Sequence, residues 1–301
     1  MAEYPALDLT FRQDEGTSEL VQLLYACLDD FEPYAIHEHE SGDGLRVFFR
    51  GRSVRGAAAD ALGIRFGSRL VSVSIVDVAD DGWARRSQAQ LTAVRVGRIV
   101  VAPPWAPEAA ARNAPVPEPG PAVPSGPGDL VVMIEPSMGF GTGHHATTRL
   151  CLHLLQRETL RERHVIDVGT GSGVLAIAAW ALGAAAVAAV DCDPDALQNA
   201  RENVRRNGAE RSIRVVESDL SGLDHPAAHV VLANLTSSAL QRHAAELLRL
   251  VLPDGRLVVS GFPPDDLRDI EGAFGRPAHE SVKEQGWAAA VFTAITPTHL
   301  N

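Results

Sequence analysis

The chain has 301 residues, with 27 lysines and arginines against 38 aspartates and glutamates, which gives a formal net charge of −11 at pH 7. So acidic a chain is not expected to bind a nucleic-acid backbone as its main partner, because phosphates repel a negative surface. Its three cysteines are widely spaced and predict neither a disulfide framework nor a metal site, which favours a reducing cytoplasm.

The first hundred residues predict alternating short strands and helices. Leu7, Leu9 and Phe11 alternate with polar residues, which indicates a strand. The expected strands are 7–11, 34–39, 45–50 and 70–78, and the expected helices are 18–28 and 54–62, the second ended by Gly63. The order β-α-β-β-α-β is the ferredoxin-like α+β arrangement. Residues 1–45 contain eleven acidic residues and one arginine, which indicates either a solvated acidic face or a docking face for a basic partner.

A proline-rich segment separates this region from the rest of the chain. Nine of the nineteen prolines lie between Pro103 and Pro127. Because proline breaks helices and cannot donate to a sheet, the segment is expected to be an extended linker. We therefore expect a ferredoxin-like domain at 1–100, a linker at 101–128 and a second domain at 129–301.

The second domain repeats strand and then helix. The expected strands are 165–169, 185–191, 213–217, 229–234 and 256–261, and the expected helices are 174–182, 194–207 and 237–251. This alternation predicts an α/β fold, a doubly wound and mostly parallel sheet of the Rossmann-like type with helices on both faces. The last residues, 281–285 and 288–295, predict an antiparallel hairpin that completes the sheet.

A glycine-rich turn follows the strand at 165–169. Gly169, Gly171 and Gly173 let a ligand approach the backbone where a Cβ atom would clash. The helix that follows points its N-terminal N–H groups into this turn. Asp191 ends the next strand, where a carboxylate can accept hydrogen bonds from both hydroxyls of a ribose. The pattern predicts a nucleotide-like cofactor at the carboxyl edge of the sheet, although similar turns also occur for structural reasons alone.

The spacing of the glycines distinguishes between cofactors. A dinucleotide fingerprint needs a glycine where the chain has Val174, which disfavours a nicotinamide dehydrogenase. S-adenosylmethionine has no pyrophosphate, and its ammonium and sulfonium charges suit the carboxylates of Asp167 and Asp191. The motif therefore predicts S-adenosylmethionine as the cofactor, with these two aspartates and the three glycines as binding residues.

A second glycine-rich segment precedes the fingerprint. Phe140 is a candidate for stacking on the methyl donor or on a substrate, and Thr142 is a candidate donor contact. Thr148 is a further candidate donor contact, although capping of a helix by Thr147 and Thr148 is the preferred interpretation of the pair. His145 is a candidate general base or substrate-positioning residue, against the simpler alternative of a hydrogen-bonded loop histidine.

Asn234 ends a buried strand with a polar side chain at the expected cofactor edge. Its amide carbonyl could accept a hydrogen bond from an incoming amine and so orient the nitrogen lone pair toward the methyl group, and it could also contact the donor. The alternative is that Asn234 caps the helix that begins near Thr236. Its position at the ligand edge favours the functional role.

These motifs together resemble the PrmA family, the bacterial class I methyltransferases that modify large-subunit ribosomal protein eleven. The likeness covers nearly the whole chain and departs from the family pattern after Asn234. The matching residues are Trp83, Gly97, Val100 to Trp105, Glu135, Pro136, Phe140 to Gly143, His145, Thr147, Thr148, Asp167, Gly169, Gly171 to Gly173, Asp191, Asp193, Pro194, Asn203, Asn207, Gly208, Ala233, Asn234 and Glu284 to Trp287.

The resemblance implies transfer of a methyl group from S-adenosylmethionine to lysine ε-amines or an N-terminal α-amine of that basic protein, recognised by the N-terminal domain. It implies that Thr148, Gly169, Asp191 and Asn234 contact the donor or frame the active site. The alternatives are a methyltransferase for small molecules or other proteins, and a non-catalytic donor-binding protein of ribosome assembly. We expect a cytoplasmic protein without a membrane partner, because the N-terminus shows no secretory signal and the longest apolar stretch, 174–190, is too short for a membrane span. We also expect a monomer that holds no metal and makes no direct contact to nucleic acid.

Overall fold

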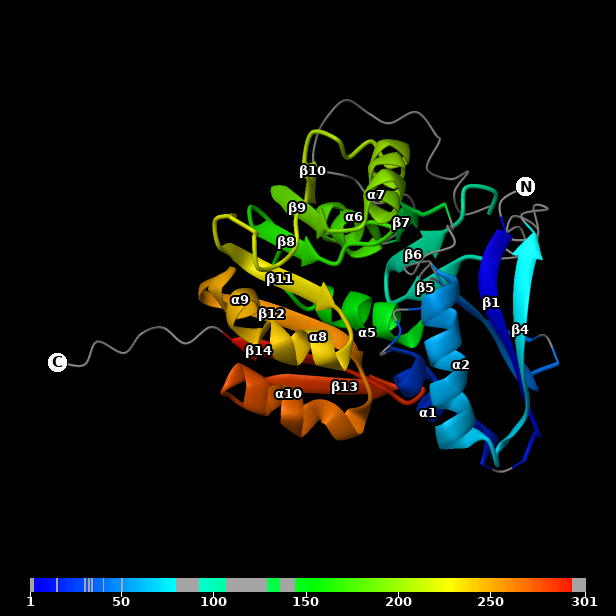
Figure 1. Ribbon diagram of the computed structural model, residues 1–301. Helices are drawn as coiled ribbons and strands as arrows, with labels where there is room; N and C mark the ends of the chain where they lie inside the picture. The colour runs from blue at the N-terminus through cyan, green and yellow to red at the C-terminus, as the bar shows by residue number, and fades with distance from the viewer. Residues whose placement is uncertain are drawn as a thin grey trace. The chain divides into compact units, whose positions relative to one another are not determined.

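The chain forms two compact units, residues 1–90 and 91–301 (Figure 1). The computed structural model describes residues 3–14, 16–29, 31, 33, 35–39, 41–49, 51–79, 92–106, 129–135 and 144–293. Most of the expected linker and the candidate residues Phe140 and Thr142 lie outside the described residues.

The first unit contains a four-stranded antiparallel sheet in the order β2-β3-β1-β4. Its elements are β1 (Glu3–Phe11), α1 (Thr17–Asp29), β2 (Ala35–Glu38), β3 (Gly44–Phe48), α2 (Arg52–Phe66) and β4 (Leu70–Ala79). Leu7, Leu9 and Phe11 of β1 are buried in one apolar cluster with residues of both helices. This order and topology confirm the ferredoxin-like prediction.

Helix α2 continues beyond the end expected from the sequence. The prediction that Gly63 ends the helix was wrong, because the helix extends to Phe66 and Gly67 follows it as the cap. Phe66 is 4% exposed and lies in the core of the unit. Burying a phenylalanine contributes about 2 kcal/mol, which outweighs the roughly 1 kcal/mol that a glycine costs inside a helix.

The second unit is built on a seven-stranded sheet in the order β10-β9-β8-β11-β12-β14-β13. Its elements after the first helix, α5 (Ala146–Leu155), are β8 (His164–Val168), α6 (Val174–Ala181), β9 (Ala186–Asp191), α7 (Pro194–Arg206), β10 (Ile213–Glu217), β11 (Ala228–Asn234), α8 (Ser237–Arg242), α9 (Ala244–Arg249), β12 (Val251–Phe262), the 3-10 helix η2 (Pro264–Asp266), α10 (Leu267–Phe274), β13 (Glu280–Glu284) and β14 (Trp287–Thr293). Strands β8 to β12 are parallel, and β14 is antiparallel to β12 and β13. The doubly wound sheet and its closing hairpin are confirmed.

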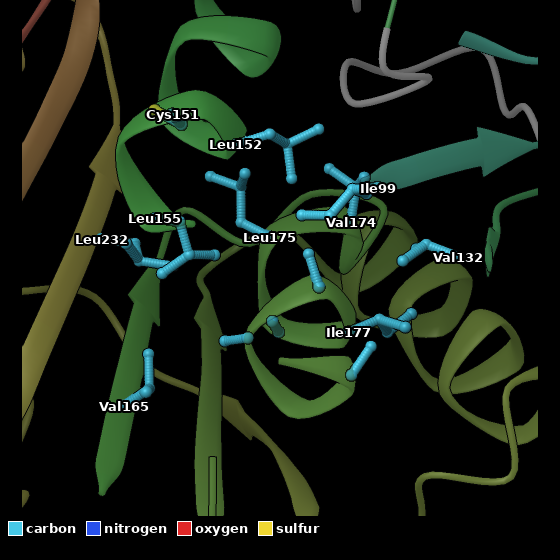
Figure 2. Close-up of a cluster of buried hydrophobic side chains, with 14 of the residues drawn as sticks. Ile99, Val132, Cys151, Leu152, Leu155, Val165, Val174, Leu175, Ile177 and Leu232 are labelled. Carbon is cyan, nitrogen blue, oxygen red and sulfur yellow. The ribbon is translucent and has the colours of Figure 1, made fainter. Parts of the chain in front are cut away.

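Alternate side chains of these strands enter two separate cores. Val165 and Leu232 pack on one face with α5 and α6, as Figure 2 shows for the residues around Leu155 and Leu175. Residues of opposite parity, such as Ile166 and Val231, pack on the other face with α8, α9 and α10. Because both faces are covered, the central strands are mainly apolar.

A smaller sheet of three strands accompanies the large one in the second unit. It consists of β5 (Val94–Val96), β6 (Ile99–Ala102) and β7 (Leu130–Met133), with β6 parallel to β7. Ile99 and Val101 are buried in the same core as α5 and α6. Residues 94–102 therefore belong to the second unit, and the chain divides at residue 90, ten residues earlier than the sequence suggests.

The prediction of a single helix at 237–251 was wrong. His243 has φ −107° and ψ 21°, which is not helical, and it divides the segment into α8 and α9. Leu240 and Leu247 on the two short helices are both fully buried under the sheet. No helix in the described ranges is long and apolar enough to cross a membrane.

Candidate functional site

Three parallel strands end side by side at one edge of the large sheet. Strand β8 pairs with β9 on one side and with β11 on the other. Their carboxyl ends therefore bring together the turn that begins at Gly169, the carboxylate of Asp191 and the amide of Asn234. The strand order changes direction at β8, and ligands of open α/β sheets bind at such a switch point.

The glycine-rich turn has a backbone that other residues would strain. Gly169, Gly171 and Gly173 have φ of 68°, 54° and 82°, in the left-handed region that favours glycine. A Cβ atom at Gly169 would lie 2.5 Å from Cδ2 of Leu235. The three glycines are therefore required by the path of the turn itself, and Gly169 also by the packing of Leu235, while Gly169 and Gly171 stay partly exposed.

Asp191 holds this turn in place. Its Oδ2 accepts the backbone N–H of Gly171 over 2.9 Å, and its Oδ1 accepts the N–H of Asp193 over 3.0 Å. Each carboxylate oxygen has a second lone pair. The side chain is partly exposed, so it can also accept hydrogen bonds from ligand hydroxyls.

Asp167 lies beneath the turn and is 1% exposed. Its Oδ2 accepts hydrogen bonds from Oγ1 of Thr170 over 2.6 Å and from the N–H of Ala176 over 3.1 Å. Its Oδ1 has no hydrogen-bond partner in the described structure. Burial raises the pKa of Asp167 to about 7, and the nearby charge of Asp191 adds to this shift. The group is therefore poised to accept a hydrogen bond or a positive charge.

This arrangement fits S-adenosylmethionine. Gly169 and Gly171 are partly exposed to a ligand at this edge, and Asp191 can accept hydrogen bonds from the ribose hydroxyls. The carboxylates of Asp167 and Asp191 suit a positively charged methionine moiety and would repel a pyrophosphate. Among the described residues, no group of three or more histidine, cysteine, aspartate or glutamate side chains could hold a metal ion.

Asn234 lies at the end of β11, in register with Ser260 of β12. The alternative that it caps the next helix was wrong, because Oγ1 of Thr236 accepts the N–H of Ala239 and caps α8. The side chain of Asn234 is partly exposed, and within the described part of the chain its amide makes no hydrogen bond. The amide is thus available to a ligand.

The chain after Asn234 is held by a close backbone contact that the sequence did not predict. The N–H of Leu235 donates to the carbonyl of Ser260 over 3.0 Å. Gly261, the residue after Ser260, has φ 102°, and a Cβ atom there would lie 2.0 Å from the carbonyl oxygen of Leu235. Gly261 therefore permits the approach that positions Asn234.

Gly261→Ala is expected to lower the free energy of unfolding by at least about 3 kcal/mol, because it combines a backbone clash with an unfavourable φ. Gly275→Ala is the matched control, since Gly275 has φ 64° but open space around it. It should cost only about 1 kcal/mol. Urea denaturation of the two variants measures the difference, and equal losses would show that the contact with Leu235 relaxes at no cost.

His145 caps helix α5. Its Nδ1 accepts the N–H of Thr147 and is 2.8 Å from Oγ1 of Thr147, so the prediction that the two threonines cap this helix was wrong. The imidazole lies edge to face with the indole of Trp287 at 5.0 Å between ring centroids. Burial, with a contribution from the charge of Arg149, lowers the pKa of His145 to about 4. Thr148 is 2% exposed in the first turn of α5.

Arg149 joins the same helix to the closing hairpin. Its guanidinium donates to Oε1 of Glu284 over 2.9 Å, to Oε1 of Gln285 over 2.7 Å and to the carbonyl of His144. With the contact between His145 and Trp287, these bonds fix the beginning of α5 against the turn of the β13–β14 hairpin. The hairpin residues Glu284, Gln285 and Trp287, which match the family pattern, therefore support the site without forming part of it.

Two buried asparagines, Asn203 in α7 and Asn207 at its C-cap, support the site from the other side. Asn203 connects the glycine-rich turn to the end of β7, and Asn207 hydrogen-bonds the backbone of Met133. Neither was predicted as a site residue. A signal was present, because Asn199, Asn203 and Asn207 recur every four residues and so lie on one helical face.

The family model of ribosomal protein L11 methyltransferase (PrmA) matches residues 44–294. The chain belongs to this family. A ribosomal protein L11 methyltransferase of Heliobacterium modesticaldum is 37% identical over 223 residues, which are 72% of this chain and 66% of the relative. One of Geobacter sulfurreducens is 38% identical over 231 residues, 75% of this chain and 71% of the relative.

A solved structure supports the fold. The ribosomal protein L11 methylase of Lactobacillus delbrueckii subsp. bulgaricus superimposes with a TM-score of 0.58 and 24% identity, and the match covers 68% of this chain and all of that one. The family membership makes this protein an S-adenosylmethionine-dependent methyltransferase, and S-adenosylmethionine is its methyl donor. The cofactor predicted from the glycine spacing is confirmed.

Proposed function

We propose that this protein transfers methyl groups from S-adenosylmethionine to amino groups of ribosomal protein L11, namely lysine ε-amines or the N-terminal α-amine. The observation that carries the proposal is the family match, which extends from β3 of the first unit to the end of β14 and so includes most of both units. We further propose that the reaction takes place in the cytoplasm and that the protein acts as a monomer without contacting nucleic acid.

The donor site is assigned to the edge of the large sheet. Gly169, Gly171 and Gly173 lie along the donor, Asp191 accepts hydrogen bonds from its ribose, and Asp167 balances its positive charge. Thr148, buried in the first turn of α5, is also assigned to the donor. Thr142 is assigned to the donor by the family pattern alone.

The chemistry is an in-line displacement. The lone pair of a neutral amine attacks the methyl carbon of the sulfonium, the carbon–sulfur bond breaks with its electrons going to sulfur, and the product ammonium then loses a proton to solvent. Most of the acceleration comes from holding nitrogen, carbon and sulfur on one line. A desolvated acceptor pocket favours the neutral amine.

Asn234 is assigned to the acceptor. Its carbonyl oxygen accepts an N–H of the amine, which aims the nitrogen lone pair at the methyl group. Phe140 is assigned to stacking beside the reacting groups by the family pattern. His145 is assigned to positioning rather than to proton transfer, because a histidine with a pKa near 4 cannot hold a proton taken from an ammonium group at neutral pH.

The test is incubation with radiolabelled S-adenosylmethionine and purified ribosomal protein L11, preceded by calorimetric titration of the donor. Label on L11, and none on another ribosomal protein of similar positive charge, supports the proposal. Donor binding with label only on a different protein or a small molecule would replace the acceptor. Donor binding with no transfer to any component of a cell extract would indicate a non-catalytic donor-binding protein.

A further inference from the structure

We propose that Asn203 is a positioning residue for the methyl donor, because it sets the shape of the glycine-rich turn from the side away from Asp191. Asn203 is fully buried in α7. Its Nδ2 donates to the carbonyl of Ser172 over 2.9 Å, and its Oδ1 accepts the N–H of Glu135 over 2.9 Å. One side chain thus connects the turn to the end of β7. The inference rests on the proposed donor site.

Within the turn, the N–H of Gly173 donates to the carbonyl of Thr170 over 2.8 Å, but the glycines on either side of Ser172 leave the rest of the turn in need of support. Ser172 lies between Gly171 and Gly173, which both have positive φ, and glycine has more conformational freedom to lose than any other residue. Two side chains hydrogen-bond the backbone around Ser172. Asp191 accepts the N–H of Gly171, and Nδ2 of Asn203 donates to the carbonyl of Ser172.

The two supports differ in what else they can do. Asp191 is partly exposed at the sheet edge and can meet the donor directly. Asn203 is 0% exposed and can affect the donor only through the backbone that it holds, at Ser172 in the turn and at Glu135 after β7. A neighbouring bond fixes the orientation of its amide, because Nδ2 also lies 3.2 Å from Oδ1 of Asn199. Losing Asn203 should therefore weaken donor binding without removing any donor contact.

Asn207 offers a matched control one helical turn further on. It is 3% exposed, its Oδ1 accepts the N–H of Met133 over 3.0 Å, and its Nδ2 donates to the carbonyls of Met133 and Asn203. Like Asn203, it fastens β7 to α7 through buried hydrogen bonds. Its hydrogen bonds to described residues are to Met133 and Asn203, outside the glycine-rich turn, so it separates support of the fold from support of the turn.

The experiment compares Asn203→Ser with Asn207→Ser in the full-length protein. Thermal denaturation should show similar losses of a few degrees for both. Titration with S-adenosylhomocysteine should show a Kd about tenfold higher for Asn203→Ser and within about twofold of wild type for Asn207→Ser. In methyl transfer, Asn203→Ser should raise the KM for the donor by a similar factor and leave kcat at saturating donor within about threefold.

Equal changes of Kd in the two variants, or an unchanged Kd in Asn203→Ser, would overturn the inference and leave Asn203 with a structural role only. If Asn203→Ser does not fold, Asn203→Gln serves instead, since it keeps both groups of the amide and moves them by one methylene, out of register with Ser172. Failure of the wild type to bind S-adenosylhomocysteine would instead contradict the proposed donor site, so the two failures are distinguishable.

Discussion

Asn234→Ala is expected to lower kcat for methyl transfer by about 10²- to 10³-fold while the Kd for S-adenosylhomocysteine changes by less than about threefold. The reason is its position at the carboxyl end of β11, beside the glycine-rich turn of β8. A single hydrogen bond that orients the attacking nitrogen acts in the transition state, whereas the donor keeps its contacts to the turn and to Asp191.

Thr236→Ala is the control for this variant. Thr236 lies two residues further along and caps α8, so its loss should cost about 1 kcal/mol of stability and leave kcat nearly unchanged. Single-turnover kinetics with saturating donor separate the chemical step from binding. Equal losses of donor affinity and turnover in Asn234→Ala would mean that the residue supports the sheet edge and does not orient the amine.

The sequence predicted the parts of this fold that follow from local patterns. The ends of β8, β9 and β11 were expected at one edge because parallel strands joined by helices have a single handedness. Their register in the structure brings Asp167 opposite Leu232 of β11 and Ala189 of β9. The predicted position of the site therefore depended on the order of strands and helices along the chain. Hydrophobic periodicity and turn residues in the sequence determine this order well.

The supports of the site could not be predicted in the same way. The close approach of Gly261 to Leu235 depends on two strand ends that meet only in the folded sheet. The bond between Asn203 and Ser172 joins residues 31 positions apart. His145 caps α5 in place of the threonines because its ring also packs on Trp287, far along the chain. Such long-range contacts override local capping preferences.

Asp167→Asn is expected to change the pH dependence of stability by up to about 4 kcal/mol. Burial raises the pKa of Asp167 from 3.8 to about 7, so between these pH values the folded state binds more protons than the unfolded state. The stability of the wild type therefore decreases as pH rises through this window, by about 1.4 kcal/mol for each unit of the pKa difference. The variant lacks this loss, so its stability relative to wild type should increase from pH 4 to pH 8.

A constant penalty opposes this gain. An asparagine would place an amide N–H₂ at the position of Oδ1, which has no hydrogen-bond partner in the described structure. An unsatisfied buried donor costs about 1 to 3 kcal/mol at every pH. Asp167→Asn should therefore be less stable than wild type at pH 5 and more stable at pH 8. Denaturant unfolding at both pH values measures the crossover, with the exposed Asp224→Asn as the control that removes the same charge.

His145 makes the wild-type profile a poor test by itself. Its pKa is lowered from 6.5 to about 4, so between these values the unfolded state binds more protons and stability increases with pH by about 3 kcal/mol in total. In the wild type, this rise offsets most of the loss of stability caused by Asp167. The combined contribution of Asp167 and His145 to the free energy of unfolding should therefore change little between pH 4 and 6.5. In Asp167→Asn the rise from His145 remains alone, so the variant should gain stability steeply over this interval. A parallel pair of profiles would mean that Asp167 is already ionised in the folded protein, with a charged or hydrogen-bonding group beside its Oδ1.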